Sequence, residues 1–400
     1  MKIAVNLFLA SPRSITGAFV YIQDILPALF KTNTENTYYL LGGSETIVYF
    51  KSLYGELPNV KFRVFDIRRD VLVNPIRAVR KLIAKVKNDY QTRENIIADE
   101  VKTYLRKQNI ELYFSPSQTI FPHDLGTIQA VTVILDLQFD YFPENFSSDY
   151  LKKRRRDARH AVERSNCLIA ISEYTKKTLE EKYNAPSEKI KVIYWAPQEL
   201  KKEPVTLNLP QDFVFFPAAI WPHKNHRILI KALGLLKDRF PSLRAVCTGT
   251  IKSRGLKNEL QQLAESEGIG DRILFAGFVS DGDMRFIYTH AKALVFPSSF
   301  EGFGMPLVEA FQFGLPVIAA DNSSITEVID GSGILVPTGD AEALAEAIER
   351  ILTDKNLCDE LIQKGRERAK LFSWDKAARE TLDVFNATVR MPRDRRARTA

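Results

Sequence analysis

The sequence predicts an α/β protein with two domains, each built on a doubly wound parallel sheet, that face one another across a deep cleft. Two observations favour this fold class. Short apolar runs alternate with helical patterns through both halves of the 400 residues. Between residues 196 and 210, prolines stand among polar residues, which is typical of an interdomain linker. We therefore expect one domain over residues 1–196 and another over 210–373, followed by a terminal helix over about 374–389.

The composition is that of an ordinary soluble globular protein, with 45% hydrophobic and 26% charged residues. No run of 18 apolar residues occurs, so we expect neither a transmembrane helix nor a signal peptide. The three cysteines lack metal-binding spacing, and their odd number argues against a disulfide framework. A reducing cytoplasm fits this usage. The net charge of +7 suggests acidic partners without identifying them.

The first half begins with a buried strand and a loop that contains Gly17, for which a tight turn and a ligand-facing backbone are equally open interpretations. Residues 19–30 have helical apolar spacing, although Pro27 limits its regularity. Further apolar runs predict the remaining strands of this half. The strands are expected at 2–7, 38–42, 60–64, 112–116, 130–136, 167–171 and 190–194.

Two basic stretches stand out in this half. Residues 76–87 combine apolar residues at helical spacing with lysines and arginines, which suits an anionic membrane surface. The favoured alternative is a surface helix with one stripe facing the core. Six of the eight residues 152–159 are basic, and we favour a solvated helix face over a contact with acceptor phosphate or membrane. No nucleic-acid-binding module accompanies this charge.

The second half repeats the alternation of strands and helices. The strands are expected at 213–217, 245–249, 273–277, 293–296, 315–320 and 333–337. The helices are expected at 227–236, from 322, at 341–352, around 361–371 and at the terminal helix. The loop after the first of these strands contains Lys224, placed where an ammonium group would neutralise a diphosphate leaving group. His223 and His226 flank it, but no third ligand is near, so we expect no metal site.

Residues 297–310 are the most informative stretch. An apolar strand precedes them, Pro306 suits the first turn of a helix, and Gly314 suits its end. In such a strand–loop–helix unit, Gly302 and Gly304 would let the backbone approach a ligand closely, and the N–H groups at the helix start favour an anion.

Two carboxylates bracket this glycine loop. Glu301 precedes it, and we place Glu309 in the first turn of the helix. Carboxylates are poor phosphate ligands but good acceptors for vicinal hydroxyls. A loop that joins phosphate-seeking amides to hydroxyl-seeking carboxylates therefore suits a sugar nucleotide.

The E-x7-E pair within E-G-F-G-M-P-L-V-E-A closely resembles the donor-site signature of family-4 retaining glycosyltransferases, which have the GT-B fold. The resemblance covers nearly the whole chain and is most specific over residues 213–337. It implies two Rossmann-like domains, with the acceptor bound by the first and the nucleotide sugar by the second. It also implies that the terminal helix crosses back to the first domain, and that transfer needs no metal or other cofactor beyond the nucleotide-sugar co-substrate.

The resemblance also assigns roles to individual residues. It implies that Glu301 orients the donor sugar, that Glu309 binds the ribose, and that Lys224 holds the diphosphate. For Asp136, at a strand end, a catalytic role and a capping role are about equally open. The remaining donor-site residues that it implies are Gly17, Val279, Gly302, Phe303, Gly304 and Leu307.

Three positions depart from the pattern of the family. Leu135 stands where the family usually has a histidine near the reacting carbon, and Ala219 stands where many relatives have an arginine. The loop at residues 15–18 holds one glycine of the usual pair. These departures put the sugar preference, the activity and the neutralisation of the diphosphate in doubt.

The resulting hypothesis is a hexosyltransferase that retains the anomeric configuration and uses a glycan or a lipid-linked acceptor. A mannosyl or rhamnosyl group is the favoured sugar. A sugar-nucleotide epimerase and a non-catalytic sugar-nucleotide binder are the alternatives, and Leu135 keeps the second one open. We expect a cytoplasmic protein whose basic helices can contact the cytosolic face of an anionic membrane, and no nucleic-acid partner.

Overall fold

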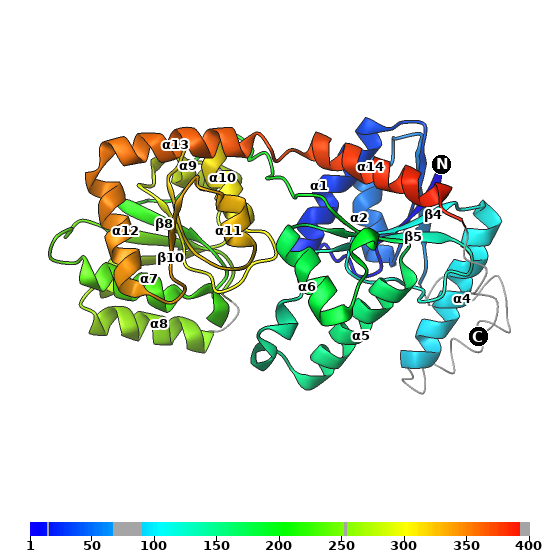
Figure 1. The fold of residues 1–400 in the computed structure, drawn as a ribbon, viewed down its shortest axis with the longest axis horizontal. Helices are drawn as coiled ribbons and strands as arrows, with labels where there is room; N and C mark the ends of the chain where they lie inside the picture. The colour runs from blue at the N-terminus through cyan, green and yellow to red at the C-terminus, as the bar shows by residue number, and fades with distance from the viewer. Residues whose placement is uncertain (14–15, 67–89, 252–253, 393–400) are drawn as a thin grey trace.

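The computed structural model describes residues 1–13, 16–66, 90–251 and 254–392. It shows two α/β domains that contact one another, with the N-terminal half forming one and most of the C-terminal half the other (Figure 1). The predicted fold class is thereby confirmed. The basic stretch at residues 76–87 lies outside the described residues.

The first domain contains a seven-stranded sheet in the order β3-β2-β1-β4-β5-β6-β7, and every neighbouring pair is parallel. Most of its central strands are buried along their whole length, which explains their continuous apolar sequences. The strands are β1 (Lys2–Asn6), β2 (Thr37–Gly42), β3 (Val60–Val64), β4 (Leu112–Ser115), β5 (Gln129–Ile134), β6 (Cys167–Ala170) and β7 (Ile190–Val192).

Helices connect these strands and cover the sheet. They include α1 (Gly17–Thr32), α2 (Ser44–Tyr54), α4 (Tyr90–Gln108), α5 (Ser148–Arg164) and α6 (Glu173–Tyr183). The helix expected over residues 19–30 is α1, and Pro27 lies inside it without ending it. The side chain of Thr16 caps the start of this helix by accepting from the N–H of Phe19.

The second domain contains a six-stranded parallel sheet in the order β10-β9-β8-β11-β12-β13. Its strands are β8 (Phe213–Pro217), β9 (Arg244–Thr248), β10 (Ile273–Gly277), β11 (Leu294–Phe296), β12 (Val317–Ala320) and β13 (Ile334–Val336). Its helices include α7 (His226–Leu235), α8 (Arg254–Ser266), α9 (Asp281–His290), α10 (Met305–Phe313), α11 (Ser323–Ile329), α12 (Ala341–Thr353) and α13 (Lys355–Ala369).

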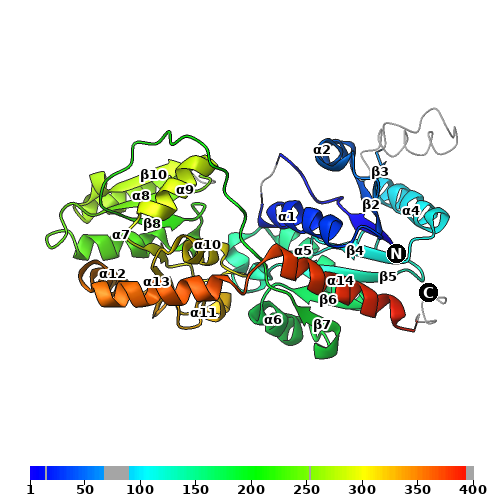
Figure 2. The same ribbon diagram turned by 90° about the horizontal axis from the view of Figure 1, so that it is seen from above.

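The last helix, α14 (Trp374–Arg390), returns to the first domain and packs beside α1 (Figure 2). The ring of Phe385 on α14 lies 4.9 Å from that of Phe114 on β4. At the start of the helix, the centre of the Trp374 ring lies 5.8 Å from the centre of the Tyr21 ring on α1. The chain therefore crosses between the domains twice, once through the linker and once between α13 and α14.

The strand order reverses once in each sheet. The reversal falls between β1 and β4 in the first sheet and between β8 and β11 in the second. Ligands of open α/β sheets bind beyond the carboxyl ends of the strands at such switch points. The loops after β8 and β11 carry Lys224 and Glu301, so the topology alone brings these two residues to one crevice.

In the described part of the chain, none of the helices has the length and apolar character needed to cross a membrane. Cys167, Cys247 and Cys358 are all free thiols.

Candidate functional site

A cleft of about 540 Å³ lies between the domains. Its walls come from the switch-point loops of the first sheet and from the glycine loop after β11. The predicted site residues that line it are Gly17, Asp136, Glu301, Gly302, Phe303 and Gly304. Lys224 reaches this group through an ion pair with Glu301, whereas Val279, Leu307 and Glu309 do not line the cleft.

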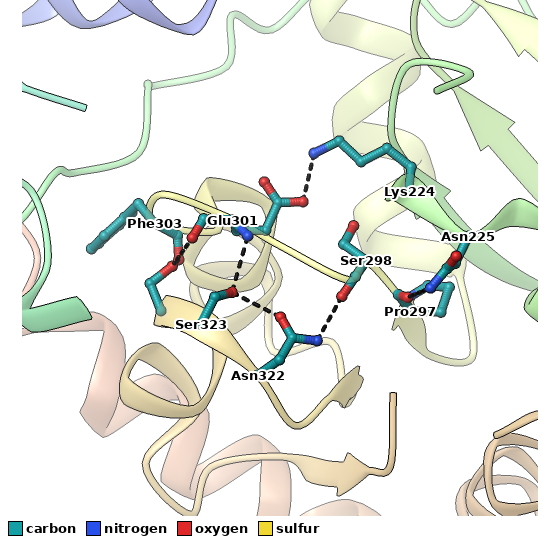
Figure 3. A network of polar contacts seen from close by, with 9 residues as sticks. Lys224, Asn225, Pro297, Ser298, Glu301, Phe303, Asn322 and Ser323 are labelled. Carbon is teal, nitrogen blue, oxygen red and sulfur yellow. Dashed lines mark hydrogen bonds and ion pairs between the residues drawn. The ribbon is translucent and has the colours of Figure 1, made fainter. Parts of the chain in front are cut away.

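Lys224 and Glu301 form the central contact of the site (Figure 3). Lys224 Nζ lies 2.5 Å from Glu301 Oε1, and the two side chains are only 18% and 14% exposed. Lys224 ends the 3₁₀ turn Pro222–Lys224 that follows β8. Because the pair is largely withdrawn from water, its charges act more strongly on a bound ligand than surface charges would.

A hydrogen-bond network fixes the loops on both sides of this pair. Asn225 adopts a left-handed backbone with φ of 58°. Its Nδ2 donates to the carbonyl of Pro297 at 3.0 Å and to Ser299 Oγ at 2.6 Å. The N–H of Ser299 donates in turn to the carbonyl of His223 at 2.8 Å. The loops after β8 and β11 are thus tied directly to each other.

The start of α11 supports the glycine loop from the other side (Figure 3). Ser323 Oγ accepts from the N–H of Glu301 at 3.0 Å and donates to Asn322 Oδ1 at 2.8 Å. Ser324 Oγ donates to the carbonyls of Glu301 and Phe303, at 2.9 and 3.0 Å. The sequence predicted only a helix start at Asn322. The signal for the support of the glycine loop was the pair of serines after Asn322, because short polar side chains often form hydrogen bonds with nearby backbone groups.

The glycine loop presents free backbone donors. Among the described residues, no hydrogen bond uses the N–H groups of Gly302, Phe303 or Gly304. Gly304 has φ of 100° and directly precedes α10, whose first-turn N–H groups carry partial positive charge. Together these groups form a donor set suited to an oxyanion.

Gly302 is required by a contact between the domains. A Cβ atom at this position would lie 2.2 Å from the carbonyl oxygen of Leu135 and 2.8 Å from Asp136 Cβ. The carbonyl of Gly302 accepts from Ser172 Oγ, at the start of α6, at 2.8 Å. The sequence-based interpretation of this glycine considered only a ligand and missed the opposing domain.

Two further contacts join the domains beside the cleft. The ring of Phe300 lies 5.2 Å from that of Tyr141 and 5.8 Å from that of Tyr174. Glu327 of α11 accepts from the first N–H groups of α6, from Glu173 at 2.8 Å and from Tyr174 at 3.2 Å. A carboxylate at a helix N-terminus satisfies otherwise unpaired donors. These contacts hold the two walls of the cleft together.

The position expected for Glu309 is wrong in one respect. α10 begins at Met305 and has no acidic residue in its first turn, so Glu309 lies one turn further along. The hydroxyl of Tyr288 donates to Glu309 Oε2 at 2.5 Å. Burial raises the pKa of Glu309. Burial of Asp24 on α1, reinforced by the charge of Glu309, raises the pKa of that carboxyl to about 6.

The two histidines of the Lys224 loop are neutral at physiological pH. Burial, reinforced by the Lys224 charge, lowers the pKa of His223 to about 3 and that of His226 to about 4. Over the described residues, no group of three histidine, cysteine, aspartate or glutamate side chains is arranged to hold a metal ion. The prediction that transfer needs no metal stays a prediction.

Residues 197–368 match the sequence model of the family described as glycosyl transferases group 1. This match covers less than half of the 400 residues, and this segment is similar to that family. The match spans the second domain, with the Lys224 loop, the glycine loop and α11. The predictions of a family of glycosyltransferases and of an enzyme are thereby confirmed, whereas the assignment to family 4 stays a prediction.

Two of the curated relatives are named mannosyltransferases of Escherichia coli. The chain is 26% identical to the O-antigen chain mannosyltransferase B of Escherichia coli, over 70% of this chain and 75% of the relative. It is 30% identical to the serotype-specific mannosyltransferase WbdA of Escherichia coli, over 60% of this chain but only 30% of the much longer relative.

Solved structures show the same fold over nearly the whole chain. The structure of HepE from Anabaena in complex with UDP and glucose has a TM-score of 0.68 at 20% identity, covering 97% of this chain and 100% of HepE. This likeness confirms the predicted GT-B architecture of two Rossmann-like domains.

Proposed function

We propose that this protein transfers a hexose from a nucleoside-diphosphate sugar to a glycan or lipid-linked acceptor, with retention of the anomeric configuration. The observation that carries the proposal is the Lys224–Glu301 ion pair beside the three free N–H groups at the β8/β11 switch point. The names of the mannosyltransferase relatives favour a mannosyl group over a rhamnosyl group. The UDP and glucose bound to HepE support a nucleotide-sugar donor.

The chemistry follows from these groups. Lys224 and the N–H groups of residues 302–304 bind the diphosphate and stabilise the negative charge that grows as it leaves. Glu301 accepts hydrogen bonds from the donor-sugar hydroxyls and orients the anomeric carbon. The acceptor oxygen bonds to that carbon on the face from which the phosphate departs, and the departing phosphate oxygen takes the acceptor proton. Closure of the two domains around the bound donor would exclude water from the cleft.

Two predicted residues complete the donor site in this proposal. Glu309 accepts from the ribose hydroxyls, and its bond from Tyr288 fixes the carboxylate in one orientation. Asp136, two residues after β5, lines the opposite wall of the cleft, and we assign it to the acceptor side. The backbone at Val279 contacts the nucleotide base.

Neither alternative gains support from the relatives, which are named transferases. Leu135, at the position of the expected histidine, lines the cleft and leaves donor-sugar recognition to other groups. We place the protein in the cytoplasm, at the cytosolic face of a membrane, because a lipid-linked acceptor would be anchored there.

The experiment is a calorimetric titration with GDP-, UDP-, dTDP- and ADP-sugars, followed by turnover measurements on wild type and on Lys224→Met. Lys231→Met, at an exposed position of α7, is the matched control. We expect selective binding of one donor and a loss of about 10²–10³-fold in kcat for Lys224→Met only. Full turnover by Lys224→Met would refute the leaving-group role, and the absence of any donor binding would refute the proposed function.

A further inference from the structure

One arginine of the basic run on α5 differs from the rest of that run. Arg154 is half-buried and lines the interdomain cleft. Arg155 forms an ion pair with Asp140 at 2.7 Å. The exposed basic side chains of the run are Lys152, Lys153, Arg156 and Arg159. The solvated face expected from the sequence thus describes the exposed members and is wrong for Arg154.

Arg154 has unused hydrogen-bonding capacity inside the cleft. Its Nη2 donates to Gln118 Oε1, and its guanidinium lies 5.4 Å from the ring of Phe139 and 6.0 Å from that of Tyr150. Its Nε is buried and has no hydrogen-bond partner. Among the described residues no carboxylate forms an ion pair with it. A guanidinium carries five donors, and a buried donor left unpaired destabilises the free protein.

Gln118 is held in an unusual conformation next to this arginine. Its φ is 61°, a left-handed backbone that residues other than glycine rarely adopt. Its N–H donates to the carbonyl of Val133 at 3.0 Å. The same loop is anchored by Asn6 Nδ2, which donates to the carbonyl of Thr119 at 2.9 Å. Conformations of this kind persist where the surroundings enforce them, and they cluster at binding sites.

Aromatic side chains form the adjoining wall of the cleft. The rings of Phe146 and Tyr150 stack at 5.2 Å, and Phe146 lies 5.9 Å from Trp221 of the second domain. All three residues line the cleft, and Tyr150 is 44% exposed. Flat, partly exposed rings offer apolar surface to the C–H face of a sugar.

We propose that Arg154 and Gln118 form the acceptor subsite and that the acceptor carries an oxyanion, either a phosphate or a carboxylate. Arg154 binds this oxyanion, and the sugar ring of the acceptor packs against the aromatic wall. This inference rests on the proposed transferase function. The guanidinium fork matches both oxyanions and binds them through paired hydrogen bonds. The donor diphosphate already has Lys224 and the N–H groups of residues 302–304, all on the second domain, whereas Arg154 and Gln118 belong to the first.

Binding of three small probes tests the inference without requiring turnover. The probes are N-acetylglucosamine 1-phosphate, glucuronic acid and neutral N-acetylglucosamine, titrated into wild type, Arg154→Gln, Arg154→Lys and Lys224→Met. Lys152→Gln, an exposed position on the same helix, is the control. We expect one acidic probe to bind about 10- to 100-fold more tightly than the neutral sugar. That preference disappears in Arg154→Gln, is reduced in Arg154→Lys, and persists in Lys224→Met and in Lys152→Gln.

The preference between probes is measured within each variant, so a partly unfolded sample does not imitate the expected result. Preference for the phosphate or for glucuronic acid identifies which oxyanion the acceptor carries. Equal binding of neutral and acidic probes by wild type overturns the inference, as does an unchanged preference in Arg154→Gln. Loss of the preference in Lys224→Met also overturns it, because the probe would then occupy the donor site. Failure of the proposed function itself shows separately, as the absence of nucleotide-sugar binding.

Discussion

A methyl group at residue 302 would collide with the backbone of the opposing domain. In Gly302→Ala, the new Cβ would lie 2.2 Å from the carbonyl oxygen of Leu135, although Cβ atoms essentially never approach other heavy atoms within 3.0 Å. That carbonyl belongs to the backbone just after β5 and cannot rotate away, so the glycine loop and the first domain must separate. Overpacking of this kind costs about 1–3 kcal/mol. Because the clash arises only between the two domains, the substitution destabilises the arrangement in which the glycine loop contacts the first domain.

The expected result is a fall in kcat/KM of about 5- to 150-fold, which corresponds to that range of free energy. Donor affinity should change much less, because Ser323 and Ser324 still hold the loop within the second domain. The assay is steady-state turnover together with calorimetric donor binding. Gly43→Ala is the control, since its Cβ would meet no heavy atom within 4 Å. If Gly302→Ala turned over as fast as Gly43→Ala, the role assigned to domain contact would be refuted.

Three further predictions concern stability. Glu327→Ala should lower the free energy of unfolding in urea by about 0.5–2 kcal/mol, because the first two N–H groups of α6 lose their acceptor while Ser172 stays as the N-cap. Glu346→Ala, at an exposed position of α12, should leave the free energy of unfolding unchanged, and equal losses in the two variants would contradict the role of Glu327. His223 and His226 have lowered pKa values, so the unfolded chain binds protons first as the pH falls below about 6.5. The free energy of unfolding should then fall by up to about 1.4 kcal/mol per histidine for each pH unit. The same dependence of this free energy on pH in a variant with both histidines replaced by glutamine would contradict this. Asp24 has a pKa raised to about 6, so its stabilising contribution at low pH is lost as the pH rises through 6. Asp24→Asn should therefore raise Tm at pH 8 but not at pH 4. An unchanged Tm at pH 8 would show that the buried carboxylate does not destabilise the protein.

The strands could be predicted from the sequence because a parallel strand covered on both faces is a short, continuous apolar run. Helices with few buried residues contain no such continuous run. In α8, Leu260 and Ala264 are the fully buried side chains, and the other residues that the structure describes there are partly or fully exposed. The apolar residues of α8 do recur at helical spacing, at Leu256, Leu260, Leu263 and Ala264, so this helix was missed although its sequence indicates it. The helices α2, α4 and α9 were missed as well.

The site could be predicted in part. Lys224 and Glu301 each follow an apolar strand, and this position together with the resemblance to the family signature selected them. Their ion pair depends on β8 and β11 being neighbours, which is a property of strand order that no local pattern contains. The roles of Gly302 and Arg154 depend in the same way on where the other domain or another helix lies.

The measurement that tests the central claim most directly is the anomeric configuration of the transfer product. Proton NMR would follow the reaction of the donor selected by titration with an acceptor, beside a sample that contains donor alone. We predict a product with the configuration of the donor, and release of nucleoside diphosphate that depends on the acceptor. A product of inverted configuration would contradict the mechanism, and a modified sugar nucleotide formed from donor alone would contradict the transferase itself.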